Sequence, residues 1–359
     1  MERTDPSGHR SISNRCSIGD PELEAMENPL MSSEATAPPN AGCVTSDTWV
    51  MTSHGARRVH DLVGLPFSAI VDGKGSTSSD AGFYFTGVKP AFDIRTSQGP
   101  SVKATADQRL LGIDRFGLTS WKTVAELRPG ERLVLHRHDR ISWDGPGTYE
   151  QGQTLGGYFT TRSHAKVYAL LRQAQAIAAD RGARVPAGAD QLATRYGMDG
   201  ASRHISGAIE AASSDFVRGF LQSCFDGLGS IAAAPDPTSL RLRTQSASDR
   251  QAMQRMLARL GILSAASDEP AAIESTLFVQ TSSLGQFAAR VGFADPDKAR
   301  ALKTLLPTQD IQRDERPAAE LSAVIPIGRV PVFDCEIPGL CAFDANGLYV
   351  HNSGPLAAA

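Results

Sequence analysis

The sequence lacks an apolar run long enough to cross a membrane. A spanning helix needs about 20 consecutive, mostly apolar residues, and no stretch of this kind occurs in the chain. The opening segment, MERTDPSGHRSISNRC, is polar and contains no apolar core of a signal peptide. We therefore expect a cytoplasmic protein with no membrane partner.

Cysteine is scarce, and the chain carries little net charge of either sign. The five cysteines are irregularly spaced, which does not suggest a disulfide framework. In a reducing compartment each of them is expected to be a free thiol. The formal charge of -3 provides no general attraction to nucleic acid, although it leaves room for local basic faces.

The length of 359 residues exceeds what one compact core usually holds, so we expect two domains. Residues 1–42 are polar and form an N-terminal flank, expected to be disordered, and residues 353–359 form a C-terminal flank. Short β-like runs with turn signals fill 43–140, a helical period dominates 145–320, and β character returns over 322–352. The pattern predicts a mainly β domain interrupted by an α+β insert.

Reactive side chains stand at both boundaries of the predicted β domain. The Cys43 thiol can attack the carbonyl of Gly42 and turn that amide into a thioester, provided that the domain supplies a base and an oxyanion donor. The Asn352 side chain can attack its own carbonyl and cut the chain before Ser353, with His351 giving a proton to the departing amine. The Ser353 hydroxyl can accept the acyl group. Singly, such residues are more often an inert thiol and a polar tail; their position at the two boundaries favours chemistry.

From Cys43 to Ser353 the chain resembles an intein, a self-splicing protein of the Hint fold. The stretches CVTSDTWVMTSHGARRVHDLVG, VKATADQRLLGIDRFGLTSWKTVAELRPGERL and VPVFDCEIPGLCAFDANGLYVHNS carry the resemblance. It is most similar to the inteins inside adenosylcobalamin-dependent ribonucleotide reductases. The resemblance implies a mainly β, horseshoe-like Hint domain that splices autocatalytically as a monomer, with no cofactor and no partner.

The resemblance also implies a role for each junction residue. Cys43 is the first nucleophile, and Thr105 orients the N-terminal scissile amide. Asp334 tunes Cys43 and the later steps. His351 assists the cyclisation of Asn352, and the serine that follows is the acceptor on the downstream flank.

Two positions depart from the family pattern. Gln108 stands where the second stretch usually carries a His, so a general acid worth roughly 10²–10⁴ in rate is missing there. Cys341 replaces another customary His. We therefore expect that splicing is slow, or that cleavage without ligation is favoured. Asp107 and Asp334 are candidates to replace the function of the missing histidines. Cys335 and Cys341 fit no CxxC-type metal spacing, so we expect no metal site from them.

The insert resembles a LAGLIDADG homing endonuclease, with TLGGYFTTR at 154–162 and LQSCFDGLG at 221–229 as its two motifs. In active enzymes the acid before the final Gly of each motif binds the catalytic metal. Here those positions hold Thr161 and Leu228, while Asp226 occupies a different place in its motif. The resemblance implies an intact endonuclease fold without its chemistry. Mg²⁺ is needed only if the endonuclease is active, and double-stranded DNA is the implied partner.

Two alternatives to this interpretation remain open, and a third is disfavoured. One is a Hint domain that forms the thioester and cleaves without ligating. Another is a DNA-binding protein, or an active homing endonuclease, whose insert grips its site through Arg241 and Arg243. The third, a ribonucleotide reductase itself, does not fit flanks of 42 and seven residues.

Overall fold

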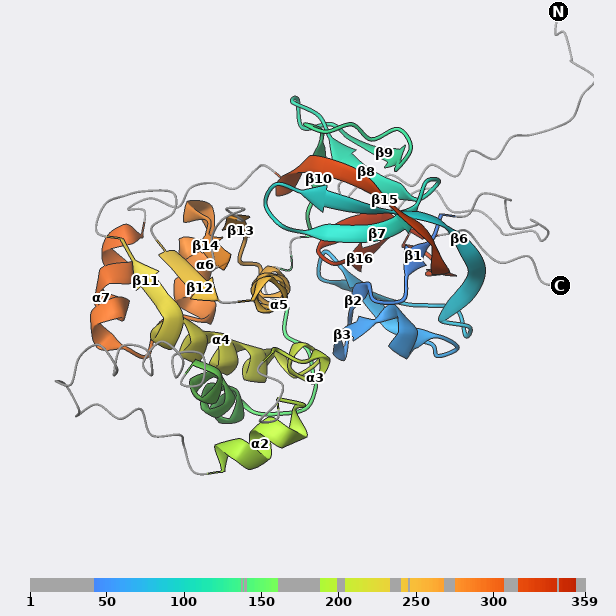
Figure 1. Cartoon of the computed structure of the whole chain (residues 1–359). Helices are drawn as coiled ribbons and strands as arrows, with labels where there is room; N and C mark the ends of the chain where they lie inside the picture. Colours follow the sequence, from blue (N-terminus) through green and yellow to red (C-terminus); the bar gives the residue numbers. More distant parts are fainter. Residues whose placement is uncertain are drawn as a thin grey trace, which may run out of the picture.

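The computed structural model describes residues 42–136, 138, 141–160, 188–198, 204–232, 240–244, 246–267, 275–306, 316–340 and 342–352. These residues form two lobes, a β domain assembled from the two ends of the described chain and an α/β insert between them (Figure 1). None of the helices in this part of the chain is long and apolar enough to cross a membrane.

The β domain contains strands from before and after the insert. Before it come β1 (Val44–Thr45), β2 (Trp49–Thr52), β3 (Gly55–Arg58), a short 3-10 helix (Val59–Leu62), β4 (Ser68–Val71), β5 (Lys74–Thr77), β6 (Phe83–Thr96), β7 (Ser101–Thr105), β8 (Arg109–Ile113), β9 (Thr119–Thr123) and β10 (Arg132–Val134). After it come β15 (Ala318–Cys335), β16 (Ala342–Ala345) and β17 (Leu348–His351). Within the described residues they form a nine-stranded sheet, β1-β7-β6-β15-β10-β8-β17-β16 with β9 on β8, and a four-stranded sheet, β3-β2-β4-β5.

Strand β15 joins the two halves of the β domain. It is 18 residues long and pairs antiparallel with β6 along most of its length, with β10 near its start, and with β1 near its end. The pairing with β1 aligns Val44 with Phe333. Since β6 and β10 precede the insert and β15 follows it, this sheet requires both segments, and its buried residues form a shared hydrophobic core.

A tight hairpin ends the described β domain. Asn346 and Gly347 connect β16 to β17 with φ angles of 56° and 93°, which is why this turn takes an Asn-Gly pair. Asn346 is fixed to the first half of the domain, because its backbone N–H donates to the carbonyl of Trp49 at 3.0 Å. The pairing of Val350 with Leu110 then places the end of β17 beside the start of β8.

The insert is an α/β unit with its own core. Its elements are a helix over 149–160, then α2 (Ala189–Arg195), α3 (Gly207–Glu210), α4 (Ser214–Leu228), β11 (Gly229–Ile231), β12 (Leu240–Thr244), α5 (Ala247–Arg259), β13 (Ser264–Ser267), β14 (Ser275–Val279), a 3-10 turn (Thr281–Ser283), α6 (Leu284–Arg290) and α7 (Pro296–Leu305). The strands pair in the order β11-β12-β14-β13.

Glycines allow the helix over 149–160 to pack closely against α4. A Cβ at Gly152 or Gly156 would overlap the carbonyl oxygens of Phe216 or Phe220 on α4. From the other side, a Cβ at Gly219 would overlap backbone atoms of the first helix. Backbones can approach this closely only where side chains are absent, so the two helices that carry the motif-like stretches lie directly against each other.

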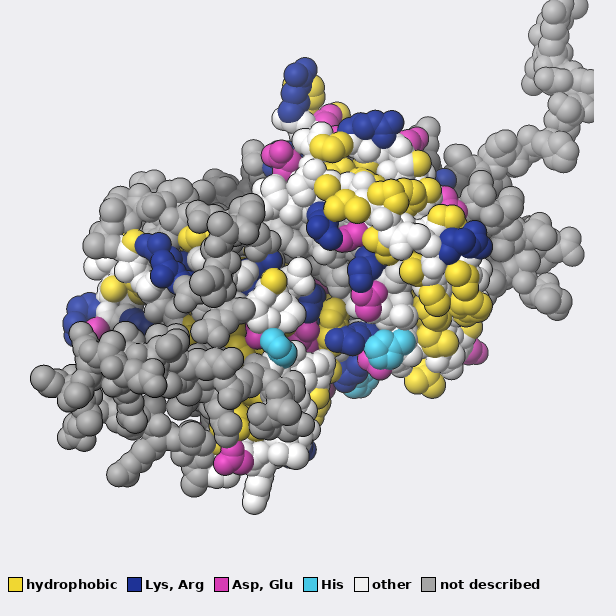
Figure 2. Space-filling model, in the orientation of Figure 1, with side chains coloured by type: hydrophobic (Ala, Val, Ile, Leu, Met, Phe, Trp, Pro, Cys, Tyr) yellow, Lys and Arg dark blue, Asp and Glu magenta, His cyan; other side chains and the backbone are white. Residues whose placement is uncertain are grey.

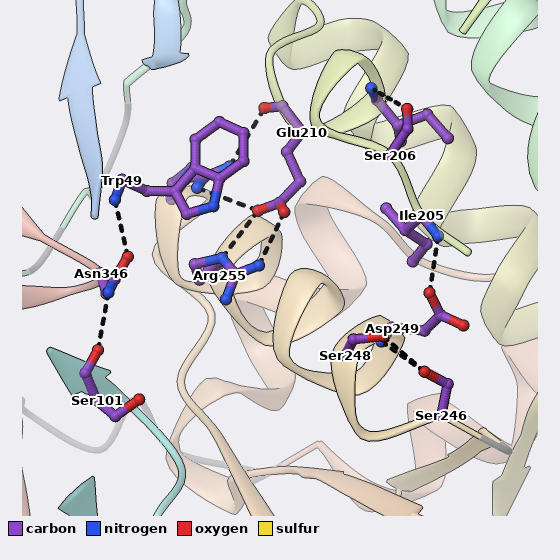
Figure 3. Close-up of polar contacts among 12 residues, drawn as sticks. Trp49, Ser101, Ile205, Ser206, Glu210, Ser246, Ser248, Asp249, Arg255 and Asn346 are labelled. Atoms are coloured by element: carbon purple, nitrogen blue, oxygen red, sulfur yellow. Dashed lines mark hydrogen bonds and ion pairs between the residues drawn. The ribbon is translucent and has the colours of Figure 1, made fainter. Parts of the chain in front are cut away.

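A buried ion pair and an aromatic ring connect the insert to the β domain (Figure 3). The carboxylate of Glu210 accepts from the Nε and Nη2 of Arg255 at 2.9 and 2.8 Å, and from Arg259 at 3.4 Å. Both guanidinium groups lie against the ring of Trp49, 5.9 and 5.4 Å from its centroid. The backbone N–H of Trp49 donates in turn to the side chain of Asn346 at 2.9 Å. Helix α5 is thereby linked to strand β2 and to the closing hairpin.

The described surface mixes charges of both signs. Figure 2 shows Lys and Arg side chains interspersed with Asp and Glu over the visible face of the β domain. This agrees with the small formal charge of -3, and it means that attraction to a polyanion would have to come from a local group of basic residues.

We expect Glu210→Gln to destabilise the protein by about 3–5 kcal/mol, because it leaves buried guanidinium charge without a counter-charge. Guanidinium chloride unfolding followed by tryptophan fluorescence measures the loss. The matched control is Asp215→Asn, since Asp215 pairs with Arg218 on the surface at 3.3 Å and should cost less than about 1 kcal/mol. Equal losses in the two variants would contradict the assigned role of Glu210.

Candidate active site

Cys43 lies immediately before β1 and is held by Thr105 at the end of β7. The backbone N–H of Cys43 donates to the Thr105 hydroxyl at 3.0 Å, and the N–H of Thr105 donates to the carbonyl of Cys43 at 3.0 Å. The first of these nitrogens belongs to the peptide bond between Gly42 and Cys43. Thr105 therefore fixes the nitrogen that would leave if this bond were broken.

The Cys43 sulfur faces two side chains of β6 that sequence reasoning did not single out. Its Sγ lies 3.0 Å from the Thr86 hydroxyl and 3.4 Å from the Lys89 ammonium. Thr86 stands where the β6–β15 register is irregular, at the step from Val332 to Phe333, and such bulges redirect side chains. The only sequence signal was one Lys within the mostly apolar run FYFTGVKPAF.

Opposing effects act on the ionisation of this thiol. Burial raises the pKa of Cys43, the hydrogen bond with Thr86 lowers it, the charge of Asp334 raises it and the ammonium of Lys89 lowers it. The net direction is upward, so the thiol form predominates at neutral pH. Thr86 and Lys89 limit this rise and stabilise the thiolate when it forms.

The two predicted junctions meet at Gln108, in the turn between β7 and β8. A Cβ on Gly42 would overlap the Cα of Gln108 and would lie 2.9 Å from both its backbone nitrogen and its Oε1. The side-chain NH₂ of Gln108 donates to the carbonyl of His351 at 2.8 Å and to that of Arg109 at 3.2 Å. Gly42 and His351, which come from opposite ends of the described chain, thus contact the same residue.

At the C-terminal junction the His351 ring lies against its neighbour. Its Nδ1 is 2.5 Å from the carbonyl oxygen of Asn352, the oxygen of the carbonyl that the Asn352 side chain would attack. The Trp121 ring meets the imidazole edge-on with centroids 4.8 Å apart. Burial lowers the pKa of His351, the Asn352 carbonyl raises it and Arg109 lowers it, with a downward net effect. A neutral ring with its proton on Nδ1 can donate to this carbonyl.

The two expected carboxylates differ in their relation to Cys43. Asp334 is buried on β15 and accepts from the Tyr84 hydroxyl at 3.2 Å and from the Cys335 N–H at 2.8 Å, and its charge raises the pKa of Cys43. Asp107 is half-buried in the turn before Gln108 and has no hydrogen-bond or ion-pair partner in the described parts of the chain. Of the two, only Asp334 interacts with the thiol.

Three predicted positions lie outside the described residues. They are Ser353, the expected acceptor; Cys341, the replacement for a customary His; and Thr161, the first degenerate metal position.

The second motif position predicted to have lost its acid lies at the end of α4, where the ammonium of Lys298 donates to backbone carbonyls. Leu228 is half-buried there. Both carboxylate oxygens of Asp226 accept backbone N–H groups from the loop before α7, at 3.1 and 3.2 Å. The Lys298 ammonium donates to the carbonyls of Phe225, Asp226 and Gly229 at 3.3, 2.5 and 2.8 Å. A cation at a helix C-terminus is electrostatically favourable, and here it is a side chain of the protein.

The structure also brings together a cluster that sequence reasoning missed. His136, His138 and Asp344 are all buried, and the Nε2 of His138 lies 2.6 Å from an oxygen of Asp344. Burial lowers the pKa of His136 to about 4, so this ring is neutral near neutral pH. Burial alone would raise the pKa of Asp344, but the two histidines hold it at about 2. The His-x-His spacing in LVLHRHDR was the available signal.

Comparison with known proteins identifies the insert more clearly than the β domain. The family described as "LAGLIDADG-like domain" matches residues 215–292. Among curated proteins, the A subunit of the DNA gyrase of Mycolicibacterium flavescens is 24% identical over 321 residues, covering 76% of this chain and 58% of that protein. The chain therefore spans little more than half the length of this relative.

Solved structures with similarity to the chain include DnaB inteins. The Ssp DnaB mini-intein variant M86 is 14% identical, with 90% of this chain and 99% of that chain covered and a TM-score of 0.33. A DnaB intein from Synechocystis sp. PCC 6803 is 12% identical, with 87% and 99% covered and the same TM-score of 0.33. Superpositions this loose add no weight to the fold derived above. The expected fold class is confirmed. The strand order defines a mainly β domain, and the family match places an α+β domain of the LAGLIDADG type within it.

Proposed function

We propose that the β domain is a Hint-type splicing domain that removes the segment 43–352 from the chain and joins its flanks. The observation that carries this proposal is the meeting of Gly42 and His351 at Gln108. Ligation requires both junctions to lie within reach of each other, and nothing in ordinary β-sheet packing requires a thiol, a His and an Asn to gather where the two ends of a domain meet. Every reacting group belongs to the chain itself, so splicing is proposed to need no cofactor and no partner and to occur within a monomer. A cytoplasmic location is part of the same proposal.

In the proposed first step, the Cys43 sulfur attacks the carbonyl carbon of Gly42, and the carbon–nitrogen bond breaks as the thioester forms. The thiol proton leaves before or during attack, and a proton returns to the departing nitrogen, which is already bonded to the Thr105 hydroxyl. Lys89, 3.4 Å from the sulfur, stabilises the thiolate. Gly42 is required because any side chain would collide with Gln108.

In the later steps, the Ser353 hydroxyl takes the acyl group from Cys43, and Asn352 then cyclises. The Asn352 side-chain nitrogen attacks its own carbonyl carbon, forms a succinimide and releases the amine of Ser353. The Nδ1–H of His351, 2.5 Å from that carbonyl oxygen, polarises the bond under attack. The amine freed at Ser353 then attacks the ester and completes the peptide bond between the flanks.

The first step is proposed to be slow. The NH₂ group of Gln108 is already bonded to the carbonyls of His351 and Arg109, and an amide cannot supply a proton to the leaving nitrogen in the way that an imidazolium can. Together with the raised pKa of Cys43, this favours a precursor that accumulates before it reacts. Cleavage without ligation is the outcome if Asn352 cyclises before the acyl transfer.

Intact mass spectrometry tests the function. We expect the native chain to yield residues 43–352 and a product that joins 1–42 to 353–359. Cys43→Ala should still cleave before Ser353, because Asn352 cyclises without the thioester, and Asn352→Ala should release 1–42 when dithiothreitol attacks the thioester. The double variant is the control and should stay whole. Full-length mass in all four proteins after prolonged incubation with thiol would overturn the proposal.

We expect Lys89→Met to shift the pH profile of thioester formation to higher pH. The ammonium of Lys89 lowers the pKa of Cys43, so its removal raises that pKa further and reduces the thiolate fraction at pH 7. A rise of one unit would slow the step about tenfold. Thiol-induced release of 1–42 from the Asn352→Ala chain gives the rate at each pH.

The control for this shift is Lys103→Met on the neighbouring strand β7, where the lysine instead pairs with the exposed Asp47 at 2.7 Å. It removes the same charge and should leave the profile in place. A profile that moves equally in both variants would assign the effect to net charge and remove Lys89 from the site.

The insert is proposed to have lost its endonuclease chemistry. A divalent ion near a phosphodiester needs carboxylate ligands, and the second motif offers Leu228, while Asp226 is already bonded to two backbone N–H groups. Lys298 adds a positive charge at the same end of α4. These contacts stabilise the helix end without a metal, which explains how the fold persists after its catalytic acid is gone.

DNA binding is the second candidate function. Arg241 and Arg243 alternate along β12 with Leu240 and Leu242, which are fully buried. The two arginines therefore project from the face of the sheet that is turned away from the apolar core. The matched family is the LAGLIDADG-like domain, and a basic sheet face is suited to contacts with phosphates.

We expect the splice-blocked double variant to leave DNA uncut with Mg²⁺ or Mn²⁺. Genes for a ribonucleotide reductase and for the A subunit of a gyrase, each without the insert, should both be tried, because the resemblance implies the first host and the curated relative bears the name of the second. Arg241→Gln with Arg243→Gln should weaken DNA binding and reduce its salt dependence. Specific cleavage that Asp226→Ala abolishes would contradict the proposed loss.

A further inference from the structure

We propose that His136, His138 and Asp344 form a binding site for one divalent transition-metal ion of the zinc type, at the boundary between the β domain and the insert. This site is separate from both splice junctions and from the degenerate endonuclease motifs. It does not depend on the proposed splicing function.

The three side chains converge in a buried space. One ligand atom from each lies within 4.8 Å of the other two, and within the described chain this is the group of His, Cys, Asp and Glu side chains that could enclose a metal ion. The relative exposures of His136, His138 and Asp344 are 2%, 1% and 4%. Zinc bonds to nitrogen and oxygen at about 2.0–2.2 Å, so the side chains would have to adjust around the ion, and His138 and Asp344 would exchange their hydrogen bond for bonds to the metal.

Unpartnered nitrogens point to a missing ligand. Neither ring nitrogen of His136 has a close hydrogen-bond partner in the described structure, where the backbone of Phe343 is the polar group that comes near, and the Nδ1 of His138 has none. Buried polar groups are almost always satisfied, so nitrogens left without partners in one cluster call for an occupant. A metal ion accepts the lone pairs of neutral imidazoles, which fits this demand.

The surroundings orient the ligands as metal sites require. The ring of His136 stacks on Tyr349 with centroids 3.6 Å apart and on His138 at 5.4 Å. The other carboxylate oxygen of Asp344 accepts the N–H of Gly347 at 2.6 Å, which turns its partner oxygen toward His138. A hydrogen-bonded carboxylate of this kind is usual at metal sites, and the stacking restrains the ring of His136.

Space and charge also suit a small cation. A cavity of about 50 Å³ between the β domain and α5 reaches His136, enough for a water that could complete the coordination. Asp72, bonded to the Tyr349 hydroxyl, brings negative charge toward His136 and favours a cation, whereas Arg259 on α5 already neutralises part of the charge of Asp344. Two imidazoles with one carboxylate favour Zn²⁺, Co²⁺ or Ni²⁺ over Mg²⁺ or Ca²⁺.

Metal binding would connect the start of the insert to the hairpin that ends the described β domain. His136 and His138 follow β10, where the chain leaves the β domain for the insert, and Asp344 lies on β16 of the hairpin whose other strand ends at His351. The backbone N–H of His136 already donates to the carbonyl of Gly347 in that hairpin turn at 2.9 Å. The ion would hold the hairpin against the insert boundary.

The test uses the full chain carrying Cys43→Ala and Asn352→Ala, without a polyhistidine tag and freed of metal by dialysis against a chelator. Co²⁺ alone is titrated first, and Zn²⁺ is then added as competitor. We expect one equivalent of Co²⁺ with visible d–d absorption and no near-ultraviolet thiolate band. Zn²⁺ should displace it and raise Tm by about 5 °C at a hundredfold excess over its Kd.

Two variants distinguish the loss of a metal ligand from the loss of the folded structure. Asp344→Asn keeps the shape of the side chain, and His136→Phe keeps the stacking on Tyr349 while it removes two unpaired nitrogens. Each should weaken Co²⁺ binding by more than about tenfold, a loss that even a supporting contact typically causes, and His136→Phe should keep the metal-free Tm at least as high as before. His204→Asn is the matched control, because His204 pairs with Asp249 at 3.2 Å on the surface of the insert.

Three results would overturn the site. The first is no Co²⁺ binding at sub-millimolar concentration by the parent chain. The second is binding that His136→Phe and Asp344→Asn leave unchanged, or that His204→Asn weakens equally. The third is a cobalt spectrum with a thiolate band, which would move the ion to the cysteines. None of these results bears on splicing, since the junctions are blocked throughout.

Discussion

The antiparallel pairing of β15 with β6 is the interaction on which the rest of the structure depends. Strands β1, β7 and β10 attach to one or both of these two, so their register places Gly42 and Cys43, the proposed N-terminal junction, at one end of the sheet. Strand β8 continues from the same sheet and receives β17, which brings the C-terminal junction to the same turn. The site at Gln108 is thus a consequence of strand order, and the insert is a long connection that leaves this order intact.

Features encoded in a local stretch of sequence could be predicted, whereas side chains that the register of distant strands brings together could not. The division into a β domain and a LAGLIDADG-type insert was predicted correctly, because the hydrophobic period changes from strand-like to helical and back. Cys43, His351 and Asn352 were found from their reactive side chains at the two boundaries and Thr105 from the resemblance, and their splicing roles stay predictions. Thr86 and Lys89 could not be found, since a bulge in a long-range strand pair aims them at the thiol. The cluster of His138 and Asp344 joins residues 206 positions apart, a separation that no local pattern reveals.

The end of α4 shows how a helix terminus can be stabilised by side chains of the protein alone. A carboxylate placed at a helix C-terminus is repelled by the helix dipole and becomes favourable only with a metal beside it. Leu228 carries no charge that the dipole could repel, and the ammonium of Lys298 donates to three carbonyl groups, although burial lowers the pKa of this lysine. Stability at this position and the capacity to bind Mg²⁺ are therefore opposed, and the contacts observed here are those that favour stability.

The division of the β domain across the insert also governs when the fold can form on the ribosome. Strand β6 emerges early, and its partner β15 emerges only after the whole insert has been synthesised. Until then the long edge of β6 has no strand to cover it, a state that invites association with other chains. An insert that folds promptly shortens the effective distance between the two halves of the β domain. The stability of the insert therefore also increases the fraction of chains in which the β domain folds. Protection of this exposed strand edge during synthesis therefore precedes any peptide-bond rearrangement.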